Sequence, residues 1–483
     1  MNGNGKDISS NVIWRLLERF SAKGVTFVVS IILARLLEPS LYGTIALVSV
    51  FTTILDVFID SGLGNALIQK KDADDLDFSS VFYFNVLMCL VLYFAMFFTA
   101  PLISNFYEKP ELTPIVRVMS LTLIISGVKN IIHAYISREM MFKKFFKVTL
   151  TGTIISAVIG IIMAYNGCGV WALVAQPIAN STIDTVMLWF SVDWWPKLLF
   201  SWARLKGLLS YGWKLLAAKL VNVSYENLRD LLIGKFYTPA ELAFYNKGSS
   251  FPVMIVPNIT ASVDGVLFPA MAAQQDDKAR IKEMVKKSIQ ISSFLIMPMM
   301  TGMIACGRPM IRLLLTEKWL PCLPYLYMFC AVYAFWSFSI ANLNAIRALG
   351  YSDIMLKIEI IEKVFSLSLL AITFRFGVFW IGISYMAGEL FSAAMCAVPN
   401  GRLIGYGLVR QIIDIAPILL TSTAMGIITY SIQLLGLSDL LTLVIQVPLG
   451  IILYLGLAYC FKLYGFTYFL NFFKTKAIRK KEK

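Results

Sequence analysis

The chain has 483 residues, of which 58% are hydrophobic and only 15% are charged, and its mean hydropathy is +0.72. This composition excludes an ordinary soluble protein, because a soluble fold of this length does not need so much apolar surface. The formal net charge of +14 is explained by the membrane topology described below, and no nucleic-acid partner is expected.

Apolar segments long enough to cross a bilayer follow one another along the whole chain. A spanning helix needs about 20 apolar residues, and the alternating pattern of a transmembrane barrel is absent. The predicted spans are 11–33, 41–67, 78–100, 114–134, 148–165, 169–190, 207–234, 242–271, 286–306, 322–346, 355–374, 378–398, 411–435 and 438–461. We therefore expect an all-α polytopic membrane protein with about 14 transmembrane helices.

Lysine and arginine are distributed unevenly between the two sides of these spans. If the N-terminus lies inside the cell, the cytoplasmic segments hold 26 of them and the opposite side holds 7. Because cytoplasmic segments of membrane proteins are enriched in lysine and arginine, this bias predicts that both termini are cytoplasmic.

The first span carries three cations at intervals of four residues, Arg15, Arg19 and Lys23. This spacing places them on one face of a helix. A charge at the bilayer centre costs about 2.5–3.5 kcal/mol on insertion scales, so this face must contact protein or water. The pattern predicts an anionic ligand, unless neighbouring carboxylates neutralise the cations and the network only holds the protein together.

The second span contains two carboxylates four residues apart. Gly62 and Gly64 follow them, and we expect these glycines either to act as bending points of a gate or to form static kinks. The seventh span is the other segment rich in charge, and the first and seventh spans together hold six cations and three carboxylates. A low-dielectric cavity with surplus positive charge requires water or an anion. The predicted substrate-binding cations are Arg15, Arg19, Lys23, Lys214, Lys219 and Arg229, and the candidate ion-coupling carboxylates are Asp56, Asp60, Glu226 and Asp230.

Other polar residues in the spans predict no catalytic, metal or cofactor site. Lys129 and His133 are expected to extend toward the cytoplasmic headgroups, and Glu359 and Lys363 have the spacing of a helical ion pair. The seven cysteines are scattered and contain no Cys-x-x-Cys pair. The connectors are too short for a catalytic domain and no phosphate-binding loop occurs, so the chain is not expected to be an enzyme.

The sequence also repeats itself. Residues 34–43 are echoed by residues 234–243, and later segments match at an offset of 208. Because each copy holds six spans, the two copies share one orientation and are related by an axis along the membrane normal. The predicted organisation is an N-lobe (1–195), a C-lobe (203–400), two further helices (401–465) and a basic cytoplasmic tail (466–483). Two such lobes around a central cavity are typical of alternating-access transporters.

These features together resemble a known family. Trp14 with the cations of the first span, residues 34–43, residues 60–64 and residues 169–173 are similar to the polysaccharide transporter branch of the multidrug/oligosaccharidyl-lipid/polysaccharide (MOP) exporter superfamily. The similarity is greatest to Wzx-type flippases of the colanic acid exporter sort.

The resemblance implies a bacterial inner-membrane protein of polysaccharide or lipopolysaccharide biosynthesis. It would move an undecaprenyl-diphosphate-linked oligosaccharide across the membrane, with the diphosphate held in a cationic central cavity. Membrane lipids and the polysaccharide polymerase machinery are the implied partners. The alternative is a cation-coupled antiporter of drugs or small molecules with the same fold, which would favour a net acidic or aromatic cleft.

Overall fold

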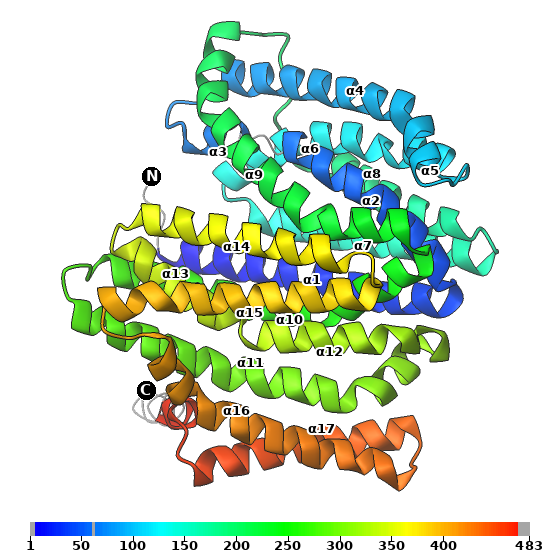
Figure 1. Ribbon diagram of the computed structural model, residues 1–483. Coiled ribbons are helices and arrows are strands. Elements are labelled where there is room, and N and C mark those ends of the chain that lie inside the picture. The colour runs from blue at the N-terminus through cyan, green and yellow to red at the C-terminus, as the bar shows by residue number, and fades with distance from the viewer. Residues whose placement is uncertain (1–4, 60–62, 472–483) are drawn as a thin grey trace. The chain divides into compact units, whose positions relative to one another are not determined.

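The structure is a computed structural model that describes residues 5–59 and 63–471. The side chains of residues 5–13, 15–20, 65 and 211 lie outside this description. Figure 1 shows the helices, which form two compact units, Met1–Ala243 and Phe244–Lys483. Every regular element of the described residues is helical, which confirms the predicted all-α class. The division into lobes at 1–195 and 203–400 stays a prediction.

Nine helices lie within the first unit. They are α1 (Gly5–Leu36), α2 (Pro39–Ile59), α3 (Leu63–Gln69), α4 (Asp75–Phe106), α5 (Leu112–Met119), α6 (Leu121–Arg138), α7 (Phe142–Tyr165), α8 (Val170–Ser191) and α9 (Trp202–Phe236). The next helix, α10 (Pro239–Ala272), begins in the first unit and continues in the second.

The second unit contains the rest of α10 and the remaining helices. They are α11 (Lys278–Leu315), the 3-10 helix η1 (Glu317–Cys322), α12 (Leu323–Ala334), α13 (Trp336–Ala348), α14 (Ser352–Thr373), α15 (Val378–Leu403), α16 (Leu408–Ser431), the 3-10 helix η2 (Ile432–Leu435) and α17 (Asp439–Cys460).

Within the described residues, each of the fourteen predicted spans is largely helical. Among the described residues, ten helical segments are long and apolar enough to cross a membrane. The four predicted spans outside this group correspond to α1, α8, α9 and α14, whose charged or polar residues lower their hydropathy. A multi-span membrane protein is therefore confirmed, and a total of fourteen spans is compatible with the structure.

Part of the second predicted span lies outside the described residues. Helix α2 is described as far as Ile59 and α3 from Leu63, and residues 60–62 between them, which include Gly62, are not described. The amide of Asn130 on α6 donates a hydrogen bond of 2.8 Å to the carbonyl oxygen of Ile59. This bond ties α6 to α2. Helix α10 is continuous despite its three prolines.

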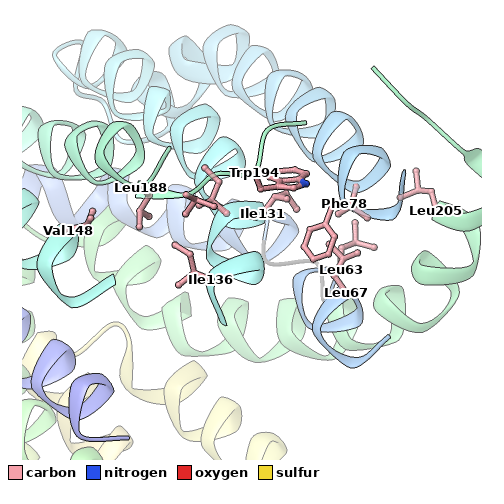
Figure 2. Packing of buried hydrophobic residues seen from close by; sticks show 12 residues of the cluster. Leu63, Leu67, Phe78, Ile131, Ile136, Val148, Leu188, Trp194 and Leu205 are labelled. Atoms are coloured by element: carbon pink, nitrogen blue, oxygen red, sulfur yellow. The ribbon is translucent and has the colours of Figure 1, made fainter. Parts of the chain in front are cut away.

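The core of the first unit fixes the segment between α8 and α9 (Figure 2). Trp194 of this segment lies 5.7 Å from Phe78 on α4 and stacks on Tyr135 on α6 at 5.8 Å between ring centroids. Its indole N–H donates to the carboxylate of Asp75 at 3.1 Å. A buried tryptophan needs such a partner, so this connector is docked on the ends of α4 and α6.

An ion pair reinforces this docking at the start of α4. Asp74 caps α4, and the guanidinium of Arg204 on α9 donates to both of its carboxylate oxygens at 2.7 Å. This hydrogen bonding lowers the pKa of Asp74 from 3.8 to about 2. A carboxyl group whose pKa is lower in the folded protein stabilises the fold above its unfolded pKa, and this contribution disappears as the pH falls toward the folded pKa.

We therefore expect the Asp74–Arg204 pair to make the thermal stability pH-dependent only between about pH 4 and pH 2. Replacing Arg204 with glutamine should reduce that dependence and leave the stability near pH 7 slightly lower. Thermal unfolding of both proteins in detergent across this range measures the effect. Parallel pH profiles of the two proteins would contradict the assignment.

The two copies of the repeated motif meet within the first unit. Gly43 on α2 lies so close to the backbone of Pro239 that a side chain at this position would overlap its carbonyl group. Close backbone contacts of this kind require glycine, because even one added methyl group has no space.

Replacing Gly43 with alanine is therefore expected to destabilise the protein by about 1–3 kcal/mol. Gly24 on α1 is the control, because no atom lies within 4 Å of the position that its Cβ would occupy. Thermal unfolding in detergent should show a loss for Gly43→Ala and none for Gly24→Ala. Equal stabilities would show that α2 can move away from Pro239 without cost.

The second unit is held together by buried amides. The side chains of Asn342 on α13 and Gln411 on α16 exchange two hydrogen bonds of 2.8 Å, and Asn400 on α15 donates to Asn342 at 2.7 Å. All three residues are fully buried. Because buried polar groups are costly unless they are paired, these bonds specify how α13, α15 and α16 pack.

Candidate functional site

An open polar cavity of about 430 Å³ is formed in the first unit by residues of α2, α6 and α9. The lining residues are Thr53, Asp56, Val57 and Ile59 from α2, Ser126, Lys129, Asn130 and His133 from α6, and Lys219 and Val223 from α9. Most of the polar residues in each set are three or four positions apart, which places them on one face of their helix. Two lysines and a histidine therefore share this cavity with the carboxylate of Asp56.

Lys129 does not extend toward the headgroups as the sequence analysis expected. Its ammonium group lies 3.0 Å from the carboxylate of Asp184 on α8, and that carboxylate is almost fully buried. Gly152 on α7 leaves the space that this carboxylate occupies. A carboxylate in the low-dielectric interior is stable only beside a cation, so this pair draws the Lys129 side chain inward.

His133 and Asn130 complete the α6 wall of the cavity. The ring of His133 packs edge-to-face on Phe145 of α7, with 4.8 Å between ring centroids. Asn130 uses its amide N–H to bond the carbonyl group of Ile59. The cavity also contains the hydroxyl-bearing side chains of Thr53 and Ser126, so both charged and neutral hydrogen-bonding groups line it.

The structure brings together two of the ten predicted site residues, Asp56 and Lys219, which line the same cavity. Arg229 lies ten residues beyond Lys219 on α9, which corresponds to about 15 Å along a helix. Its side chain is buried, with the guanidinium 5.5 Å from the ring centre of Tyr225. Arg229 and the half-buried Asp230 are therefore remote from this cavity.

The remaining predicted residues divide into two groups. Lys23, Lys214 and Glu226 have exposed side chains and do not line the cavity. The side chains of Arg15 and Arg19 and the whole of Asp60 lie outside the described residues.

Four residues that the sequence analysis did not assign to a site belong to this cavity or support it, namely Lys129, Asn130, His133 and Asp184. A usable signal was present in the sequence. Lys129 and Asp184 are opposite charges within two different predicted spans, and charges inside a membrane protein are usually paired. What the sequence could not show is that α6 and α8 are neighbours.

A family model described as "Polysaccharide biosynthesis protein" matches residues 32–324, which is more than half of the chain. The chain belongs to this family. The succinoglycan biosynthesis transport protein ExoT of Rhizobium meliloti is 25% identical over 65% of this chain and 64% of ExoT. The teichuronic acid biosynthesis protein TuaB of Bacillus subtilis is 23% identical over 84% of this chain and 86% of TuaB. The lipopolysaccharide biosynthesis protein WzxC of Escherichia coli is 22% identical over 67% of this chain and 66% of WzxC.

This member of the polysaccharide biosynthesis protein family thus spans just under two thirds of ExoT and WzxC and most of TuaB. Among solved structures, the lipid II flippase MurJ in an inward closed conformation matches with a TM-score of 0.74 and 16% identity, over 93% of this chain and 98% of MurJ. An outward-facing MATE family transporter of the MOP superfamily matches with a TM-score of 0.53 and 16% identity, over 84% of this chain and 97% of that one.

These similarities show that the polysaccharide biosynthesis protein has the fold shared by MurJ and the MATE transporters. The predicted membership of a family of polysaccharide biosynthesis proteins is confirmed. The expectation that the chain is not an enzyme is also confirmed at the level of the family.

Proposed function

We propose that this protein is a flippase that moves an undecaprenyl-diphosphate-linked oligosaccharide across the bacterial inner membrane by alternating access. The observation that carries the proposal is a lysine-lined polar cavity inside a chain with the MurJ fold. The family match and the relatives named for polysaccharide biosynthesis and transport support the same substrate class.

The chemistry of the cavity suits the headgroup of such a lipid. Lysine ammonium groups bind phosphate as point charges, and Lys219 and Lys129 would supply two of them. The side chains of Thr53, Ser126 and Asn130 would bind sugar hydroxyl groups. A volume of about 430 Å³ accommodates part of a headgroup and excludes a long prenyl chain, which would stay in the lipid.

The other predicted cations keep their proposed role in binding the diphosphate. Arg15, Arg19 and Lys23 of α1 and Lys214 and Arg229 of α9 would contact the substrate at other stages of transport. Guanidinium groups suit this purpose, because their planar fork donates two hydrogen bonds to one phosphate.

Asp56 provides a route to ion coupling. It lines the same cavity as Lys219, so its carboxylate and a substrate phosphate would compete for the same ammonium group. A carboxylate that loses its neighbouring cation in this way takes up a proton or a sodium ion more readily. Asp60, Glu226 and Asp230 are the further candidates for this role.

The proposed setting follows from the charge bias and the family. Both termini would be cytoplasmic, and the exported oligosaccharide would be delivered to a polymerase on the other side of the membrane. Cysteine labelling of a residue in the basic tail, in intact cells and in permeabilised cells, tests the orientation. Labelling in intact cells by a membrane-impermeant reagent would contradict it.

The direct test of the proposed function is transport by the purified full-length protein in proteoliposomes. A lipid-linked oligosaccharide with a fluorescent sugar should become accessible to an impermeant quencher faster than in protein-free liposomes. The alternative function, cation-coupled antiport of drugs, predicts uptake of a cationic dye driven by an ion gradient. Dye uptake without movement of the lipid-linked oligosaccharide would overturn the flippase proposal.

A further inference from the structure

A second pocket, of about 320 Å³, lies in the second unit and is unrelated to the cavity described above. Its lining residues are Arg308 from α11, Leu320 from η1, Leu323 and Tyr327 from α12, Tyr430 from α16 and Gln433 from η2. The predicted topology places these helix ends on the side of the membrane opposite to the termini. The pocket combines one cation, two phenol groups and an amide with two leucines.

The cation in this pocket is available to a ligand. Within the part of the chain that the structure describes, Arg308 forms no ion pair. One turn further along α11, Arg312 lies 3.2 Å from the carboxylate of Glu317 and 3.7 Å from that of Asp439. The same helix end therefore holds one arginine that is ion-paired with protein carboxylates and one that is not.

The other polar groups are arranged around Arg308. Gln433 is oriented by a hydrogen bond from its amide to the carbonyl group of Ala305, one turn before Arg308 on α11. Tyr327 packs against the backbone of Gly307, where glycine leaves room for the phenol ring. The hydroxyl groups of Tyr327 and Tyr430 provide donors beside a guanidinium group that donates in a planar fork.

Exposed leucines follow the pocket residue Gln433 in the sequence, and we call them the rim. Leu434 and Leu435 follow Gln433 directly and are 81% and 69% exposed, and Leu440 and Leu441 at the start of α17 are also exposed. In a multi-span membrane protein such side chains contact acyl chains. A ligand that fills the pocket and covers this rim must therefore have a polar head and an apolar tail.

We propose that this pocket binds the headgroup of an anionic phospholipid, with the phosphate on Arg308 and the acyl chains on the leucines of η2 and α17. The absence of carboxylates among the six lining residues favours an anionic lipid over a zwitterionic one, because the pocket offers a cation for the phosphate and no anionic group for a lipid ammonium group. The site is separate from the proposed transport site and does not depend on it.

Native mass spectrometry of the full-length protein, titrated with phosphatidylglycerol or phosphatidylcholine, tests this assignment. Replacing Arg308 with glutamine should weaken the binding of phosphatidylglycerol about tenfold, since hydrogen bonds between charged groups are strong. Tyr430→Phe, which removes a single hydroxyl group, should weaken it less. Arg375→Gln is the matched control, because Arg375 is an exposed arginine with the same predicted topology and lies outside the pocket.

Each other outcome overturns the proposal. Equal binding of phosphatidylglycerol by the wild type, Arg308→Gln and Tyr430→Phe would exclude this pocket as the site. Equal binding of the two lipids would exclude selection by charge. If glycerol phosphate or glucuronate, which lack acyl chains, competed at the same concentration as the lipid, the site would recognise a small anion instead.

Discussion

Replacing Lys219 with glutamine is expected to reduce transport of the lipid-linked oligosaccharide at least tenfold. Lys219 lines the cavity of the first unit together with Lys129 and Asp56, and its ammonium group would interact with the substrate phosphate. Glutamine keeps most of the side-chain length and removes the charge, which is the part of the interaction that a phosphate requires. Export in a strain that lacks the chromosomal gene, and transport in proteoliposomes, measure the loss.

The controls separate this effect from a general defect. Lys206→Gln removes a charge from an exposed position at the start of the same helix, α9, and should leave transport unchanged. Lys219→Arg should retain part of the activity, because it preserves the charge. Membrane insertion and thermal stability of all three variants should match the wild type. Normal export by Lys219→Gln would refute the assignment of this cavity to the substrate.

The largest effect on stability is expected from Asp184→Leu. This change leaves the ammonium group of Lys129 without its buried carboxylate partner, from which it is separated by 3.0 Å. Removing one partner of a buried ion pair costs about 3–5 kcal/mol, and the lower end applies because the Lys129 side chain is 26% exposed. We expect the free energy of unfolding, measured by denaturant titration in mixed micelles, to fall by about 3 kcal/mol.

A double variant shows whether the loss of stability in Asp184→Leu comes from the unpaired charge of Lys129 or from the removal of the carboxylate side chain. Lys129→Met combined with Asp184→Leu replaces both charges with apolar groups and should recover most of the stability. Asp193→Asn, at an exposed carboxylate just beyond α8, should have little effect. A double variant as unstable as Asp184→Leu alone would show that the single variant acts by poor packing rather than by an unpaired charge.

The double variant also tests the chemistry of the cavity. If Lys129 contributes charge to the substrate site, the stable double variant should still transport more slowly than the wild type. If Lys129 serves only to neutralise Asp184, transport should be unchanged.

The helices of this protein could be predicted from the sequence because, in a membrane, helix formation depends on the residues of each segment alone. In lipid each backbone group must be satisfied within its own segment, so a run of about 20 apolar residues is sufficient to identify a span. Every span predicted in this way coincides with helix in the described residues, including α9 with its five charges between Lys214 and Asp230. The lysine and arginine bias and the family resemblance likewise depend only on the order of residues.

Only the tertiary structure decided which charges meet. The spacing along one helix identifies a face, but the partner of that face comes from a helix far away in the sequence, as Asp184 does for Lys129 across 55 positions. Similarly, the repeat relates residues 234–243 to residues 34–43 without saying that Pro239 packs on Gly43. The sequence therefore determined the membrane class, the helical segments and the family, and it named Asp56 and Lys219, which line the same cavity, among its candidate residues. The packing of α2, α6, α8 and α9 decided the rest, because burial and ion pairing depend on contacts between helices that hydropathy does not encode.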